Sequence, residues 1–167
     1  MLFRSLRVVS HADNYRYRIE EELSAPAVIQ PEHLFGLMQR YTKDFIAQTD
    51  CSLLSLDKSE VLRLLDYYLI FRLNLLNSIS MQAQRMSHIP WRQQPSDIRQ
   101  QFINFLRLRC LTQAGHKVLK IRMEDLAQEL HQSRLNVSRM LNALQRDGLL
   151  TMSRGVITVP QLEALRG

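Results

Sequence analysis

The chain has 167 residues, of which 46% are hydrophobic and 23% are charged, and its net charge is +6. These proportions are typical of a globular protein and exclude an intrinsically disordered chain. No apolar run approaches the roughly 20 residues that span a bilayer. Arg4 and Arg7 interrupt any apolar segment of a signal peptide, so we expect neither membrane insertion nor secretion.

The positive charge is concentrated in the second half of the chain. Residues 1–89 carry 10 Lys and Arg against 10 Asp and Glu, whereas residues 90–167 carry 12 against 6. Ten of those 12 cations are Arg, the side chain best shaped to bind phosphate and guanine. This distribution predicts two modules, the second with a polyanionic partner. Solvated Arg residues without a partner are the alternative.

The residues that usually carry catalysis or bind metals form no recognisable pattern. Cys51 and Cys110 are far apart and match no metal-binding spacing, so an iron-sulfur cluster is not expected. Two such cysteines fit a reducing cytoplasm, and we expect both to be small buried hydrophobes. The five histidines are scattered, and the sequence contains no HExxH, Gly-rich phosphate loop or nucleophile elbow. We therefore expect no enzyme activity, no cofactor and no metal.

The N-terminal part is predicted to be β-structure. Apolar and charged residues alternate over residues 15–20, the period of a strand, and residues 2–9 are a second candidate. Residues 11–14 have the composition of the turn between them. Residues 27–29, 45–49 and 51–56 are further short candidates, punctuated by Pro26, Pro31 and Gly36.

Two helices are predicted next. Asp57 with Glu60 three residues later has the pattern of a capping box that opens a helix over residues 59–65. A long helix over residues 67–86 contains no Gly or Pro. It has an apolar stripe with coiled-coil-like spacing, formed by Leu69, Leu73, Leu76 and Ala83. A second stripe is formed by Tyr68, Leu75, Ile79 and Met86. One stripe can pack on its own chain and the other on a partner; burial within one chain is the alternative.

A hinge and a third helix follow. Ile89-Pro90 and Pro95 predict a boundary that helices cannot cross. Ser96 is expected to cap the next helix, which we expect to extend to Gly115. Residues 117–121 are predicted to form a strand that pairs with a later hairpin.

Two short helices joined by a tight turn are predicted between positions 123 and 150. Apolar residues recur at helical period on one face of each. Ser133 offers its hydroxyl to the first amides of the second helix, and Gly148 ends that helix. Because the exposed face of the second helix is polar and carries Arg, the pair indicates a helix-turn-helix. An ordinary pair of packed helices is the alternative.

A basic hairpin follows. Residues 149–152 and 156–159 are predicted to be strands around Ser153-Arg154-Gly155. A hairpin directly after a helix-turn-helix forms a wing, and Arg154 at its tip would lie near a phosphate backbone. The combination favours DNA binding more than either part alone.

This region resembles the DNA-binding helix-turn-helix of the Crp/Fnr superfamily. The matching features are Asp125-Leu126-Ala127, Ser133-Arg134, Val137-Ser138-Arg139, and Leu144 before Gly148-Leu149-Leu150. The sequence departs from the family at two positions. His131 stands where the family usually has Gly at the turn, and Leu135 stands where many members carry a base-reading Glu.

The resemblance and the chemistry of the side chains together suggest a DNA interface. We expect Arg139 to read a base, and Arg134 to contact either a base or a phosphate. Leu135 could pack on a thymine methyl group. The full set of expected DNA-binding residues is Ser133, Arg134, Leu135, Asn136, Ser138, Arg139 and Arg154.

The resemblance also extends to a sensor domain. The N-terminal strands resemble the second half of the family's β-roll, and the residues expected near its effector pocket are His33, Phe35, Gly36 and Arg40. Cyclic-nucleotide-binding members place Glu after that Gly, and follow the Arg with Ser or Thr and Ala. Here Leu37 follows Gly36, and Tyr41-Thr42 follow Arg40, so cyclic AMP binding is not expected. Because the family's roll needs more strands than this part holds, we expect a shortened sensor domain that begins at Met1.

We therefore predict an α+β protein with three parts. Residues 1–57 would form a partial β-roll sensor, residues 58–89 a connecting and dimerisation helix, and residues 90–167 a winged helix-turn-helix. The predicted function is a cytoplasmic transcription regulator that binds near-palindromic double-stranded DNA as a homodimer. RNA polymerase and an unidentified small-molecule effector are further expected partners. The alternative is a ligand-binding or protein-interaction module that has lost DNA binding.

Overall fold

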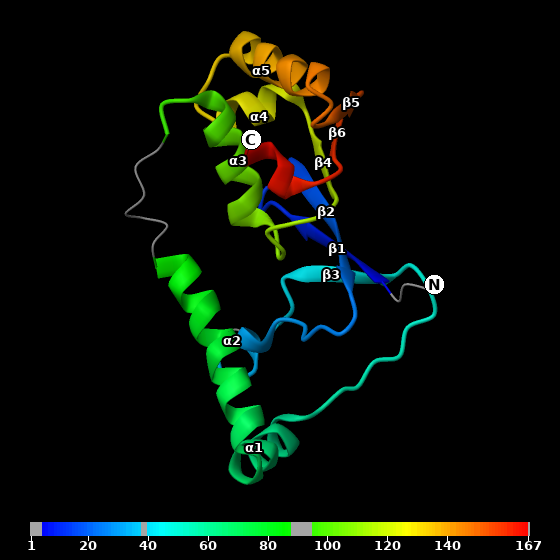
Figure 1. Cartoon of the computed structure of the whole chain (residues 1–167), viewed down its shortest axis with the longest axis vertical. Helices are drawn as coiled ribbons and strands as arrows, with labels where there is room; N and C mark the ends of the chain where they lie inside the picture. The colour runs from blue at the N-terminus through cyan, green and yellow to red at the C-terminus, as the bar shows by residue number, and fades with distance from the viewer. Residues whose placement is uncertain (1–4, 38–39, 88–94, 167) are drawn as a thin grey trace. The chain divides into compact units, whose positions relative to one another are not determined.

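The structure is a computed structural model that describes residues 5–37, 40–87 and 95–166 (Figure 1). The strands are β1 (Ser5–His11), β2 (Tyr17–Ser24), β3 (Lys43–Ala47), β4 (Lys117–Ile121), β5 (Thr151–Ser153) and β6 (Val156–Val159). The α-helices are α1 (Lys58–Tyr67), α2 (Leu69–Ser87), α3 (Ile98–Arg109), α4 (Met123–Glu129) and α5 (Arg134–Arg146). Two 3-10 helices, η1 (Pro31–His33) and η2 (Leu162–Arg166), complete the described elements. The predicted α+β class is confirmed.

The chain divides into two compact units. The first contains the strands, α3, α4, α5 and η2, and the second contains η1, α1 and α2. The three domains predicted from the sequence stay a prediction. The predicted hinge at Ile89-Pro90 lies outside the described residues. No helix in the described part is both long and apolar enough to cross a membrane.

One antiparallel sheet, in the order β3-β1-β2-β4-β6-β5, forms the frame of the first unit. Its centre is the pairing of β2 with β4, in which Ile19 lies opposite Leu119. The hairpin of β1 and β2 therefore belongs to the same sheet as the hairpin of β5 and β6, although residues 25–150 lie between them in sequence. Figure 1 shows the N-terminal strands beside β4.

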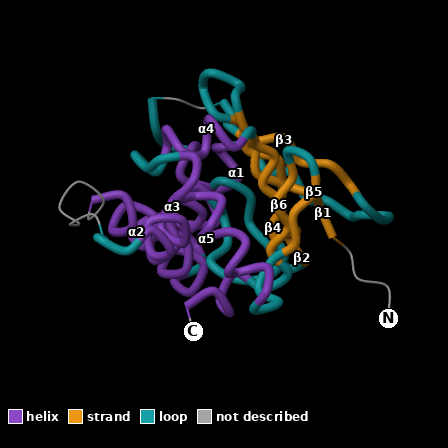
Figure 2. The backbone as a smooth tube through the Cα atoms, turned by 90° about the horizontal axis from the view of Figure 1, so that it is seen from above, coloured by secondary structure: helices purple, strands orange, loops and turns teal. Residues whose placement is uncertain are grey.

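The core of the first unit lies between this sheet and helices α3, α4 and α5 (Figure 2). The sheet contributes Ile19, Leu119 and Ile157, each at most 4% exposed. Helix α3 inserts Phe102 and Leu106, which are four residues apart and therefore on one face. Burial of these side chains removes apolar surface from water and provides the main driving force for folding of the unit.

Two predicted strands are wrong. Residues 27–29 and 51–56 form no strand in the structure. Both runs are short and apolar, a pattern that a strand shares with many exposed loop segments. Pro26 has no amide hydrogen to give to a neighbouring strand. The other predicted strands are confirmed where they are described, with ends shifted by a few residues.

The predicted ends of the third helix also need correction. Asp97, not Ser96, caps α3: its carboxylate accepts hydrogen bonds from the amides of Arg99 and Gln100 at 3.2 and 3.3 Å. The helix ends at Arg109 rather than at Gly115. The amides of Leu111 and Thr112 do not continue the helix, because they donate to the carboxylate of Glu21 at 2.5 and 3.0 Å.

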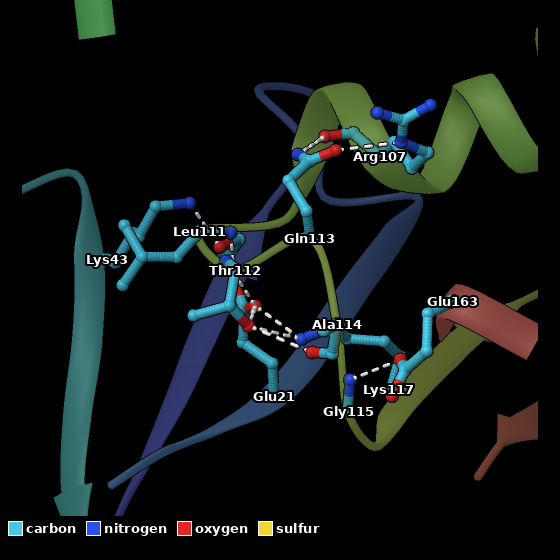
Figure 3. A network of polar contacts seen from close by, with 11 residues as sticks. Glu21, Lys43, Arg107, Leu111, Thr112, Gln113, Ala114, Gly115, Lys117 and Glu163 are labelled. Carbon is cyan, nitrogen blue, oxygen red and sulfur yellow. Dashed lines mark hydrogen bonds and ion pairs between the residues drawn. The ribbon is translucent and has the colours of Figure 1, made fainter. Parts of the chain in front are cut away.

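Glu21 is the centre of a buried polar network that joins the loop after α3 to β2 and β4 (Figure 3). Lys117 Nζ donates to Glu21 at 2.9 Å and to the hydroxyl of Thr112 at 2.6 Å. Burial raises the pKa of the neighbouring Cys110 thiol to about 12, and the negative charge of Glu21 adds to this shift. Cys110 therefore stays protonated and, as predicted, is a buried apolar residue; Cys51 is only half-buried.

The second unit is helical. Asp57 caps α1 by accepting a hydrogen bond from the Glu60 amide at 2.8 Å. The Ser59 hydroxyl and this amide hold the pKa of the Asp57 carboxyl below its ordinary value. Tyr68 is extended and separates α1 from α2. Arg72 of α2 donates to the last carbonyl groups of α1, Leu65 at 2.6 Å and Asp66 at 3.2 Å. The two predicted helices and the break between them are confirmed.

Candidate nucleic-acid interface

The turn between α4 and α5 contains His131, which stands where the family usually has glycine. His131 has φ +51°, in the left-handed region that glycine adopts most easily. Its amide donates to Gln128, and the Gln132 amide donates to Ala127. This pair of bonds is the Schellman arrangement, in which the residue just beyond the helix is left-handed. A glycine at this position would adopt the turn without steric strain.

Helix α5 has a well-formed cap at each end. The Ser133 hydroxyl accepts a hydrogen bond from the Asn136 amide at 3.1 Å, as the sequence predicted. At the other end Gly148 has φ +72°, and Leu149 donates to the carbonyl of Leu144 at 2.9 Å. Backbone groups at both ends of α5 that would otherwise be unsatisfied therefore have hydrogen-bond partners.

The exposed face of α5 carries most of the predicted DNA-binding residues. Val137, Leu141 and Leu144 bury the opposite face. Leu135 is 58% exposed, and Arg139 lies one turn further along the same face. Arg134 and Ser138 lie on one flank of this face and Asn136 lies on the other. Six of the seven predicted residues are thus brought together at the N-terminal half of one helix.

Two further residues of the same face were not among the expected DNA-binding residues. Asn142 and Arg146 are exposed and continue the line of Leu135 and Arg139 at spacings of three and four. The helical period alone could have found them.

Ion pairs lie at the start of each of the two helices, and one of them joins α4 to α5. Arg134 Nη1 is 3.3 Å from the carboxylate of Glu124 on α4. Arg122, the residue just before α4, donates a hydrogen bond to Asp125. This hydrogen bond holds the pKa of the Asp125 carboxyl below its ordinary value; the positive charges of Arg122 and Arg16 add to the shift, and burial opposes it. The Arg122 Nε to Asp125 distance is 2.7 Å.

The seventh predicted residue lies in the wing. Strands β5 and β6 pair antiparallel, and Gly155 at φ +73° allows the tight turn between them. Arg154 is exposed at the tip. The wing is anchored to the rest of the sheet because β6 pairs with β4. Two helices with a fixed turn, followed by an anchored hairpin, define a winged helix-turn-helix DNA-binding domain.

Comparison with known families agrees with this geometry. Residues 100–167 match the family model described as the Crp-like helix-turn-helix domain. The predicted resemblance to the Crp/Fnr superfamily is confirmed over these residues, which form a Crp-like helix-turn-helix domain.

Several solved structures are similar to the chain at low identity. The c-di-GMP-responsive global regulator CLP of Xanthomonas campestris is 17% identical, covering 93% of this chain and 80% of that one, with a TM-score of 0.42. The catabolite activator protein of Thermus thermophilus is 20% identical, covering 97% and 75%, with a TM-score of 0.38. A CRP/FNR-family regulator of the same species is 20% identical, covering 98% and 84%, with a TM-score of 0.37. No curated protein matches the chain. The family assignment rests on residues 100–167.

The predicted effector residues lie in the second unit. His33 Nε2 is 3.1 Å from Nε2 of Gln30, and its side chain is 17% exposed. Phe35 faces Lys58, whose Nζ lies 5.2 Å from the ring centroid. Gly36 and Arg40 are exposed. Their role in effector binding stays a prediction.

The predicted dimerisation stripe is exposed in the single chain. Leu69, Leu73 and Leu76 are 62%, 50% and 53% exposed, and Ala83 is also exposed. Leu75 of the second stripe is half-buried. Helix α2 thus presents an apolar face that no described residue of its own unit covers.

Proposed function

We propose that the chain regulates transcription as a cytoplasmic homodimer that binds a near-palindromic DNA site. Each subunit would place α5 in the major groove, with the wing against the sugar-phosphate backbone. RNA polymerase would be a further partner of the DNA-bound dimer. The exposed polar face of α5 is the observation that carries the proposal.

Arg139 is the residue most suited to reading a base. It is exposed at the middle of this face and has no hydrogen-bond or ion-pair partner among the described residues. An unpaired guanidinium can donate two hydrogen bonds to O6 and N7 of guanine without first breaking a contact within the protein. Leu135, one turn earlier, offers only apolar contact, which suits a thymine methyl group.

Dimerisation through α2 supports the same function. An exposed stripe of Leu69, Leu73 and Leu76 matches the seam of a two-stranded coiled coil. A twofold dimer places two recognition helices on half-sites about 34–36 Å apart, one turn of the DNA helix. A near-palindromic site would therefore match the symmetry of the protein.

The test separates base reading from backbone contact. A preferred duplex is first selected from a random library, and binding is then measured by fluorescence anisotropy at three salt concentrations. Arg139→Ala should cost about 1–3 kcal/mol on the preferred site and flatten discrimination at one position. Arg154→Ala should weaken all duplexes alike and reduce the slope of log affinity against log salt by about one.

The two variants serve as controls for each other. If they prove indistinguishable, α5 does not lie in the groove. If the unmodified chain shows no salt-dependent affinity for DNA, a protein-interaction module becomes the better interpretation.

We further propose that the effector is not cyclic AMP. Leu37 provides no carboxylate beside Gly36, and Tyr41-Thr42 replace the small residues that should follow Arg40. A ligand present at 100 times its dissociation constant stabilises a fold by about 2.7 kcal/mol. A thermal scan with cyclic AMP at millimolar concentration should show no such shift, whereas a clear rise in melting temperature would contradict the proposal.

A further inference from the structure

The turn of the N-terminal hairpin lies against the helix-turn-helix. We define the hairpin tip as residues 12–16, between β1 and β2. Ala12 and Tyr17 close the turn with a backbone hydrogen bond of 3.1 Å, and the Tyr15 amide donates to Ala12 at 2.8 Å. The Asn14 side chain accepts from the Arg16 amide at 3.0 Å. Tyr15 has φ +55° and is 80% exposed, so the turn holds a large polar ring in solvent.

Arg16 connects this tip to α4. Its Nη1 is 3.1 Å from the amide oxygen of Gln128 and 3.9 Å from the carboxylate of Asp125. Its side chain nevertheless remains 53% exposed. The guanidinium therefore lies on the surface of α4 and does not enter the core.

The charge of Arg16 is not needed to neutralise Asp125. Arg122 already contacts both oxygens of that carboxylate, at 2.7 and 3.3 Å, and is itself 71% exposed. Two guanidinium groups thus share one carboxylate. Arg16, Arg122 and Asp125 together carry one net positive charge, and the nearby acidic residues are Asp13 within the tip and Glu124, whose charge acts on Arg122.

In a helix-turn-helix complex the first helix crosses the sugar-phosphate backbone while the second lies in the groove. Arginine, asparagine and tyrosine are the side chains that commonly contact phosphate oxygens. The hairpin tip places Arg16 on that first helix, and Asn14 and Tyr15 are exposed in the same turn.

We propose that the hairpin tip is an additional DNA-binding element, in which Arg16 and the adjacent Arg122 contact a phosphate of the strand that α4 crosses. The proposal rests on the function proposed above. The N-terminal hairpin then contributes directly to DNA affinity, because β2 is hydrogen-bonded to β4 and moves with the winged helix. Such contacts position the protein on DNA without reading its sequence.

The experiment measures the affinity of the full chain for several unrelated duplexes over a range of salt. Arg16→Ala should weaken binding to every duplex several-fold and reduce the slope of log affinity against log salt by about one. Arg16→Lys keeps the charge and should keep the slope. Arg63→Ala is the matched control, because Arg63 is also an exposed, ion-paired arginine but lies on α1; it should leave binding unchanged.

A purely structural role for Arg16 gives a different result. Gln128→Ala removes the partner of Arg16 but leaves its charge, so it should retain the salt slope if Arg16 contacts phosphate. If Gln128→Ala and Arg16→Ala have the same effect, or if Arg16→Ala leaves the slope unchanged, the hairpin proposal is wrong. In that event, if discrimination between bases still depends on Arg139, the function proposed above stands. Absence of DNA binding by the unmodified chain would overturn both.

Discussion

The Glu21 carboxylate and the Lys117 ammonium lie 2.9 Å apart, and each side chain is only 1% exposed. This ion pair joins the N-terminal hairpin to the winged helix across β2 and β4. Removing one member of a buried pair leaves an uncompensated charge away from water. We expect Lys117→Met to lower the free energy of unfolding by about 3–5 kcal/mol, measured by urea denaturation.

A neighbouring pair on the same two strands provides the control. Lys120 lies 2.7 Å from Glu20, but it is 36% exposed, so water screens the interaction. Lys120→Met should cost about 0–1 kcal/mol. Glu21→Gln combined with Lys117→Met should recover part of the loss, because no buried charge then remains. Equal effects of the two lysine variants would contradict a buried pair.

The sequence predicted the helix-turn-helix well because its signals are local. The apolar period, the Ser133 cap and Gly148 are all determined within a few residues. The pairing of β2 with β4 was not predicted, since no short-range pattern specifies which strands meet across about 100 residues. Glu21 and Lys117 face each other at buried positions of their strands, where charged residues are uncommon. The opposite charges of these two residues are the feature of the sequence that suggests the pairing of β2 with β4.

A fall in pH should lower the stability that the Asp125 carboxylate of α4 contributes to the fold. The hydrogen bond from Arg122 holds the pKa of Asp125 below its ordinary value of 3.8 in the folded protein. A lowered folded-state pKa means that the carboxylate stabilises the fold above its unfolded-state pKa. This contribution is lost as the pH falls below 3.8 and through the folded-state pKa.

Asp125→Asn removes this titration. Between about pH 6 and pH 3 the unmodified chain should lose more stability than the Asn variant, measured by urea midpoints. Asp13→Asn, an exposed change in the hairpin tip, should follow the unmodified chain. Parallel pH profiles for the Asp125 variant and the unmodified chain would contradict the expectation.

The exposed stripe on α2 predicts the oligomeric state. Leu73→Glu together with Leu76→Glu should convert a dimer into monomers, because charges in an apolar seam would be buried without partners. Light scattering measures the mass directly. Leu62→Glu, at an exposed leucine of α1 outside the stripe, should leave the dimer intact. A monomeric unmodified chain would show that the stripe is not a dimer seam.

The ion pair between Glu124 and Arg134 predicts a variant that binds DNA more tightly. Both side chains are exposed, 58% and 71%, so the pair contributes only about 0–1 kcal/mol to stability. Near DNA the Glu124 carboxylate would repel phosphates and compete with them for Arg134. Glu124→Gln should therefore raise affinity for all duplexes several-fold at low salt, and the gain should shrink as salt screens the charges. Glu60→Gln, which breaks the comparable exposed pair with Arg63 on α1, is the control and should leave affinity unchanged. A loss of affinity in Glu124→Gln would instead mean that the ion pair holds Arg134 in its DNA-binding orientation, and Glu124 would then be a positioning residue of the interface.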